Sequence, residues 1–440
     1  MTTAQVFAIA GPAMVANLTT PLIGIVSTTA IGRLGEATLL GGVAMASVVF
    51  DCVFWLFAFL RMSTVAFTAQ SLGAGEAGEL RALLARGLLL AGLIGAVLIL
   101  LQAPLSAIVF DAMGGSEGVT RAAKTYFAVR IWSAPLVLAN YVVLGWLVGQ
   151  ARATTALVLQ VAINLVNMVL TALLVLRLDT GIAGAAIAAV VAEASGLVIG
   201  ILVAGHLLRG RFTVPRAMLL DSAKVKRMLS VNRDIMIRTA ALISVWLFFT
   251  AQGARAGDVA LAANAVLNNF LLISAFFLDG LANAAQQLCG QAFGARDKTA
   301  FSGATRVIVL WGFAFASAVA LTFALLGPQL VDAMTASAEV RQTARNFLVF
   351  VIASPLFAVY AFVLDGVYIG ATWARDMRNL MIASLFIFLA AWLALRSFGN
   401  AGLWGALLAH YLARGGLEAA RYPALLKSSF AAPISASPRP

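Results

Sequence analysis

Charged residues are scarce in this chain of 440 residues, where Asp, Glu, Lys and Arg together make up 11%. Soluble domains carry roughly 25%. Hydrophobic residues make up 62%, more than a soluble core could hide. The composition therefore excludes an ordinary soluble domain and predicts that lipid is the solvent.

Histidine and cysteine are nearly absent, with two of each. His206 and His410 have no partners at ligand spacing, so no metal site is expected. Cys52 and Cys289 fall in predicted helices of opposite halves and are interpreted as small packing residues. The chain also has no G-x-x-x-x-G-K-[ST] motif to cradle phosphates and no nucleophile–histidine motif. We therefore expect neither an enzyme nor a bound cofactor.

Long apolar runs recur along the whole chain. Spanning a bilayer takes about 20 residues, and twelve runs reach that length. They lie at approximately 5–32, 39–72, 80–110, 122–150, 153–177, 182–208, 233–254, 259–292, 302–327, 342–371, 377–396 and 400–422. The first run lacks a basic n-region and a cleavage site, so we interpret it as a retained helix. The sequence predicts an all-α membrane protein with twelve transmembrane helices.

The two halves of the chain repeat one another. Gln70 and Gln291 each open a Gln-x-x-Gly-Ala motif, about 220 residues apart, and Pro135 and Pro355 have the same separation. Each half has an even number of helices, so the halves enter the membrane in the same direction, as in transporters with parallel repeats. We expect an N-lobe at 1–208, a basic cytoplasmic linker at 209–232, a C-lobe at 233–422 and a disordered cytoplasmic tail at 423–440.

The net charge of +12 is distributed unevenly. Most of the Lys and Arg residues fall on the side that also holds both termini, with the excess between the sixth and seventh runs. This positive-inside pattern predicts a bacterial-type inner membrane protein with both termini cytoplasmic. Anionic lipid headgroups are sufficient partners for these charges, and no nucleic acid is expected. Arg61, Arg130 and Arg238, near helix ends, are expected to reach headgroups.

Amide and carboxyl side chains form a stripe along the predicted helix 259–292. The stripe consists of Asn264, Asn268, Asp279, Asn283 and Gln286, at spacings that place them on one helical face. Polar groups facing lipid would be costly. We expect the stripe to line a substrate cavity, with hydrogen bonding between helices as the alternative.

A second polar face and several single carboxylates are further candidates. Gln160, Asn164 and Asn167 recur at i, i+4 and i+7 on helix 153–177. Asp365 precedes two glycines that would allow local unwinding, as in the ion sites of broken helices. Glu193 lies among small residues of helix 182–208. For each carboxylate the alternative is a purely structural hydrogen bond or ion pair.

Two prolines interrupt the first predicted helix. Pro12 and Pro21 each free a carbonyl and permit bending. They are candidate hinge residues, and a static kink is the alternative.

Several ordered motifs carry a family resemblance. They are Pro12 with Asn17-Leu-Thr-Thr-Pro21, Phe59-Leu-Arg61-Met62-Ser63-Thr64, Asn232-Arg233-Asp234, Leu278-Asp279-Gly280 and Asp365-Gly366. Together they resemble the DinF-type branch of the MATE (multidrug and toxic compound extrusion) family across the membrane region. The resemblance implies a V-shaped, two-lobed fold and export of amphipathic organic compounds, driven by a gradient of H⁺ or Na⁺.

The chain departs from the family pattern at three positions that are usually acidic. These positions hold Ser27, Thr171 and Gln286, none of which titrates in the physiological range or carries charge. The hydroxyls of Ser27 and Thr171 could still line the cavity and help to coordinate Na⁺. We therefore expect ion coupling to depend on Asp279 and Asp365 in the C-lobe, with Glu193 as a further candidate.

The expected activity is secondary active antiport of xenobiotics by alternating access. The expected substrates are small organic cations or neutral amphipathic compounds, because the cavity is rich in Asn and Gln. H⁺ or Na⁺ is the only co-reactant implied, and a monomer is expected. Alternatives are an uncoupled facilitator, a flippase for lipid-linked substrates, and a membrane scaffold or receptor that does not transport.

Overall fold

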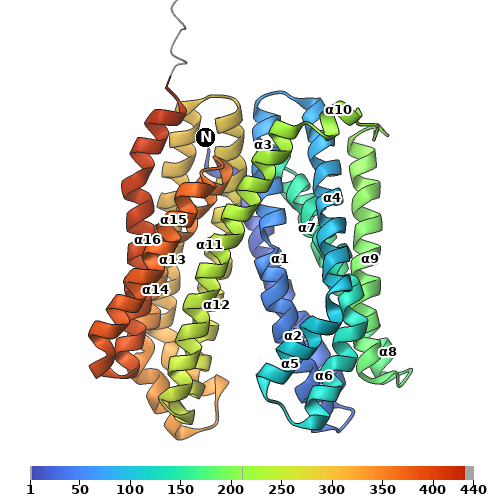
Figure 1. The fold of residues 1–440 in the computed structure, drawn as a ribbon. Helices are drawn as coiled ribbons and strands as arrows, with labels where there is room; N and C mark the ends of the chain where they lie inside the picture. The colour runs from blue at the N-terminus through green and yellow to red at the C-terminus, as the bar shows by residue number, and fades with distance from the viewer. Residues whose placement is uncertain (1, 211, 432–440) are drawn as a thin grey trace, which may run out of the picture. The chain divides into compact units, whose positions relative to one another are not determined.

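The computed structural model describes residues 2–210 and 212–431, and these are almost entirely helical, with no strand among them. The chain divides into two compact units. The N-terminal unit comprises residues 7–239. The C-terminal unit comprises residues 240–431 together with the first residues of the chain, up to Val6. Figure 1 shows long helices running side by side within each unit.

The helices of the N-terminal unit correspond to the first six apolar runs predicted from the sequence. Its helices are α1 (Thr3–Gly32), α2 (Ala37–Leu56), α3 (Phe59–Gly73), α4 (Ala77–Leu100), α5 (Gln102–Met113), α6 (Glu117–Arg130), α7 (Ala134–Gly149), α8 (Ala153–Leu176), α9 (Gly181–Leu207) and the short α10 (Arg216–Leu219). Three predicted runs are each broken into two helices. At one break, Pro135 lies in the first turn of α7, where its missing N–H costs no hydrogen bond.

Helix α7 is the centre of the N-terminal unit and packs against α3, α4 and α9. Close approach requires glycine on the facing surfaces. A Cβ on Gly145 would lie 2.6 Å from the carbonyl oxygen of Arg61, and a Cβ on Gly95 would lie 2.4 Å from Cα of Pro135. Trp146 is fully buried, and its Nε1 donates to the carbonyl of Leu80 at 2.8 Å. These contacts fix the backbone of α3 and α7, from which several polar side chains project.

The C-terminal unit contains six long helices. They are α11 (Ser222–Arg255), which begins in the N-terminal unit, α12 (Asp258–Gly294), α13 (Lys298–Met334), α14 (Ala338–Gly370), α15 (Ala374–Leu395) and α16 (Asn400–Ser429). Helix α14 packs against α12, α13 and α16. A Cβ on Gly366 would lie 2.3 Å from the carbonyl oxygen of Ala282, so the glycine permits the tight contact between α12 and α14.

Eleven helical segments of the described residues are long and apolar enough to cross a membrane. Helix α16, which corresponds to the predicted run 400–422, is not among the eleven, and it carries Arg414, Glu418 and Arg421. It is nevertheless a continuous helix of 30 residues. The structure therefore has a helical segment for each of the twelve predicted runs, and the last of these is not among the eleven apolar segments.

The predicted domain boundaries differ from the structure in two places. The division between the units falls within α11, after Thr239, and not in the expected linker 209–232. The expected tail begins inside α16, which continues to Ser429. Packing accounts for this extension, because the Phe430 ring packs edge-on against Phe293 and at a tilt against Phe301. The expected disorder of 432–440 lies outside the described residues.

Candidate functional site

A buried ion pair joins α16 to α14 in the C-terminal unit. The Arg414 guanidinium donates a hydrogen bond to Oδ2 of Asp365. The two residues are only 2% and 5% exposed. A buried charge is stable only when it is paired, so each of these groups depends on the other.

Two further carboxyl groups interact electrostatically with the same guanidinium. They belong to Asp279 of α12 and Glu418 of α16. Glu418 is fully buried and lies one helical turn after Arg414, on the same face of α16. We call Asp279, Asp365, Arg414 and Glu418 the acidic cluster. It contains three carboxyl groups and one guanidinium, so its formal charge is negative when all four groups are ionised.

Neighbouring aromatic side chains hold the acidic cluster in place. The guanidinium of Arg414 lies over the Phe362 ring, 5.5 Å from its centroid. The Tyr368 hydroxyl donates to the backbone carbonyl of Glu418 at 2.7 Å. A pocket with about 220 Å³ of empty space lies beside the cluster, between α12, α14 and α16, and Phe362 and Tyr411 form part of its wall. Phe362 thus contacts both Arg414 and this pocket, whose wall, among the described residues, includes none of the four cluster residues.

The predicted stripe on α12 divides into two environments. At one end, Nδ2 of Asn264 and Oδ1 of Asn400 lie 2.9 Å apart, and Trp404 Nε1 donates to Oδ1 of Asn264 at 2.9 Å. This arrangement matches the alternative of hydrogen bonding between helices. At the other end, Asn283 Nδ2 donates to the backbone carbonyl of Asp279 at 2.8 Å, and Gln286 is buried. Asn268 lies half-buried between the two ends.

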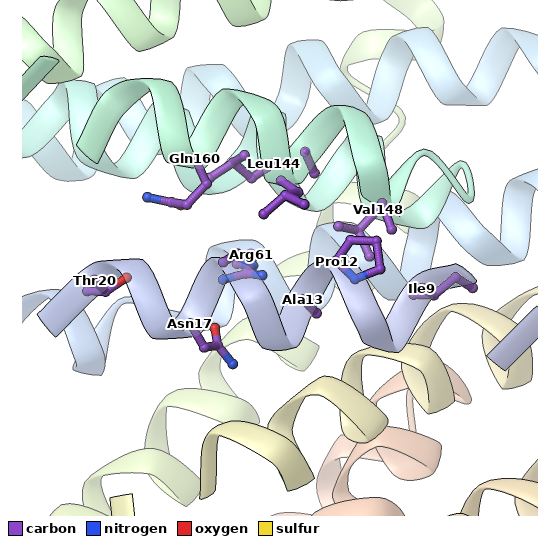
Figure 2. A pocket seen from close by; sticks show the side chains of 13 residues that line it. Ile9, Pro12, Ala13, Asn17, Thr20, Arg61, Leu144, Val148 and Gln160 are labelled. Atoms are coloured by element: carbon purple, nitrogen blue, oxygen red, sulfur yellow. The ribbon is translucent and has the colours of Figure 1, made fainter. Parts of the chain in front are cut away.

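The N-terminal unit holds a larger pocket, with about 470 Å³ of empty space, between α1, α3, α7 and α8. Figure 2 shows Pro12, Asn17 and Thr20 along α1, with Arg61 from α3 and Gln160 from α8. The remaining wall is apolar and includes Ile9, Leu144, Val148 and Leu157. The structure therefore places one predicted cavity residue, Gln160, and one predicted hinge residue, Pro12, in the wall of this pocket. Pro21 lies further along the continuous helix α1.

Hydrogen bonds connect the polar face of α8 to α1. Gln160 Nε2 donates to Asn164 Oδ1 at 3.0 Å, and Asn164 Nδ2 donates to the Thr19 hydroxyl at 2.8 Å. The Thr171 hydroxyl donates to Asn167 Oδ1 at 3.3 Å. Thr171 is fully buried. Many polar side-chain groups of this face of α8 are therefore engaged in hydrogen bonds between and within helices.

The predicted coupling residue Glu193 lies in the N-terminal unit, whereas Asp279 and Asp365 lie in the C-terminal unit. Asn140 Nδ2 donates to the Glu193 carboxylate at 2.7 Å and to its carbonyl at 2.9 Å. Arg130 interacts electrostatically with Glu193 and Asp51. Glu193 therefore lies in a separate polar group, together with Asn140, Arg130 and Asp51. Ser27, also in the N-terminal unit, is half-buried on α1.

Several charged residues at these sites were missed or misread from the sequence. Arg130 was expected to reach lipid headgroups, but it donates to the Tyr126 hydroxyl at 2.6 Å and interacts with Glu193. Arg414 and Glu418 lie at i and i+4 within an apolar run, a signal as clear as that of Asp365. Arg61 was expected to reach lipid headgroups, but the structure places it in the wall of the larger pocket. Its position near the start of α3 is compatible with both locations, and packing against α7 decides between them.

Comparison with known proteins shows the family. The MatE family model matches residues 12–173 and 235–392. DNA damage-inducible protein F (DinF) of Escherichia coli is 37% identical over 92% of this chain and 88% of its own length. A mutant of the Vibrio cholerae MATE transporter VcmN has a TM-score of 0.88 at 21% identity, covering 97% of this chain and 98% of that one. A multidrug resistance MATE family transporter of the MOP superfamily, in an outward-facing conformation, has a TM-score of 0.86 at 18% identity, covering 97% and 96%.

The expectations of a multi-pass membrane protein and of a transporter that is not an enzyme are confirmed. The two solved structures share the twelve-helix fold, and the family model covers more than half of the chain. The chain therefore belongs to the MATE family of multidrug efflux transporters and is a homologue of DinF.

Proposed function

We propose that this transporter is a secondary active antiporter that exports amphipathic organic compounds in exchange for H⁺ or Na⁺ by alternating access. We further propose that it works as a monomer in a bacterial-type inner membrane, with both termini cytoplasmic. The observation that supports the proposal most strongly is the acidic cluster. In it, Arg414 donates a hydrogen bond to Asp365 and interacts electrostatically with Asp279 and Glu418.

The charge of the acidic cluster supplies the physical reason for coupling. All three carboxyl groups interact with one guanidinium, and ionised carboxylates are costly in a low-dielectric interior. Binding of a proton or a Na⁺ ion would offset that charge, and carboxylate oxygens suit hard cations. Arg414 acts as a built-in cation that competes with the transported ion for the same carboxylates. Release of the ion strengthens the pairing with Arg414, which gives the unit two alternative arrangements.

Glu193 is the further candidate in the N-terminal unit. Its carboxylate accepts from Asn140 and interacts with Arg130, so its charge is already partly compensated. We assign the main coupling role to the acidic cluster and a secondary one to Glu193.

Flux measurements in proteoliposomes test the proposal. Purified protein would be reconstituted, and a pH gradient and a Na⁺ gradient imposed separately. The probes are dansylcholine, dansylglycinamide and dansylglycine, which share one fluorophore and carry positive, no and negative net charge. We expect uphill movement of at least one probe under one of the two gradients. Downhill movement that ignores both gradients would identify a facilitator. Movement of a fluorescent lipid-linked substrate, with no flux of the three probes, would identify a flippase.

A further inference from the structure

The larger pocket of the N-terminal unit has an uneven charge. Among the described residues that line it, Arg61 is the only one that carries a charge at neutral pH. Asn17, Thr20 and Gln160 are the polar neutral members, and the rest of the wall is apolar. The pocket thus combines an apolar surface with one cationic group.

The backbone of Arg61 is fixed by the packing of α3 against α7. The approach of Gly145 to the Arg61 carbonyl, where a Cβ would lie at 2.6 Å, leaves no room for α3 to shift. Arg61 is half-buried and its side chain contributes to the pocket beside α1 and α8 (Figure 2). The backbone that carries the Arg61 side chain is therefore fixed beside the pocket.

The acids of this unit that interact with nearby groups lie outside that wall. Glu193 accepts from Asn140, and both Glu193 and Asp51 interact with Arg130. Tyr141 is within electrostatic reach of Arg61, Asp51 and Glu193, so these two acids lie in the same region of the unit as Arg61. They do not place a negative group in contact with a molecule that fills the pocket.

We propose that this pocket selects amphipathic compounds that carry a carboxylate or a similar acidic group, which Arg61 binds. Arginine is always protonated and presents a planar fork that matches a carboxylate. In a pocket of low dielectric the same charge repels an organic cation. That such compounds are exported rests on the proposed function, whereas their binding does not. The selectivity is opposite to the preference for cations expected from the content of Asn and Gln.

Equilibrium binding of the three dansyl probes tests the inference. Purified protein in lipid nanodiscs, with no gradient, would be titrated with dansylglycine, dansylglycinamide and dansylcholine, and the dansyl fluorescence recorded. We expect dansylglycine to bind at least about tenfold more tightly than dansylcholine, because hydrogen bonds to charged groups are the strong ones. Dansylglycinamide should lie between them. A wild-type protein that binds dansylcholine as well as or better than dansylglycine overturns the inference without any variant.

Variants of Arg61 identify the residue responsible. Arg61→Gln should abolish the preference for dansylglycine, and Arg61→Lys should keep part of it. Arg152→Gln is the matched control, since Arg152 is exposed at the start of α8 and its loss changes the net charge equally. If Arg61→Gln weakens all three probes by the same factor, Arg61 has only a structural role and the inference fails. Binding is measured without a gradient, so its outcome does not depend on flux. Uncoupled or absent flux would therefore contradict the proposed function and leave the binding inference intact.

Discussion

The guanidinium of Arg414 on α16 donates to the carboxylate of Asp365 on α14, and both side chains are buried in the C-terminal unit. Glu418 is fully buried and Asp279 is half-buried, and the same guanidinium interacts with both and stabilises their charged forms. The stability of this unit and its proposed ion coupling therefore depend on the same few atoms.

A double-mutant cycle measures that dependence. Arg414→Met should lower the stability of the protein by about 3–5 kcal/mol, because it leaves buried carboxylates without their cation. Adding Asp365→Asn to Arg414→Met should restore part of the loss. Thermal unfolding of the wild type, the two single variants and the double variant in detergent provides the measurement. Strictly additive effects would show that the two side chains do not interact.

The hydrogen bonds of Asn264 should stabilise the contact between α12 and α16. Asn264→Leu leaves Asn400 and Trp404 without their partner and should cost about 1–3 kcal/mol. Asn269→Leu is the matched control on the same helix, because Asn269 is exposed and its Nδ2 donates to the carbonyl of Ala265 in its own helix. Its effect should stay within about 0.5 kcal/mol. Equal thermal stability of the two variants would contradict the assignment.

Gly366 should tolerate no side chain. A Cβ there would lie 2.3 Å from the carbonyl oxygen of Ala282 and 2.9 Å from Cβ of Ala285, so Gly366→Ala must push α12 and α14 apart. The expected cost is about 1–3 kcal/mol. Gly303→Ala, in α13 with nothing within 4 Å of the added Cβ, should be neutral or stabilising, since alanine favours a helix. The melting temperatures of the two variants provide the measurement. If Gly366→Ala melts no lower than Gly303→Ala, the prediction is wrong.

Arg86 should hold the segment between the sixth and seventh predicted runs against α4. Its side chain donates to the carbonyls of Leu219 at 3.0 Å and Met218 at 2.6 Å, and pairs with Glu79 at 2.6 Å. Arg86→Gln should accelerate hydrogen exchange of α10 by more than about tenfold, since bonds from a charged donor contribute about 1.5–3 kcal/mol each. Arg81→Gln, on the same helix, is the control. Unchanged exchange in Arg86→Gln would mean that other contacts hold α10.

The helices could be predicted because each of the long apolar runs is a direct signal of a membrane-spanning segment. The breaks within runs could not, because hydropathy is continuous across Phe57 and Ala58, where α2 ends and α3 begins. The sequence also did not indicate that α16 extends past the predicted run to Ser429. This extension depends on the packing of Phe430 against rings from α12 and α13, which no local pattern reveals.

The candidate sites could be predicted only in part. Asp279 and Asp365 stand out because a charge in an apolar run is costly and therefore unlikely to be incidental. The sequence does not say that Arg414 lies against Asp365, because that contact joins residues 49 positions apart. Arg61 shows the same limit, since only the close packing of Gly145 turns a residue near a helix start into part of a pocket wall.

Flux through a double variant of the acidic cluster tests the proposed coupling most directly. The wild type and Asp279→Asn/Asp365→Asn would be reconstituted in proteoliposomes, and uphill efflux of a transported dansyl probe measured under imposed pH and Na⁺ gradients. The proposal predicts that the variant binds the probe as the wild type does and moves it downhill, but no longer moves it uphill under either gradient. Undiminished gradient-driven efflux in the double variant would contradict the proposed coupling through these carboxylates.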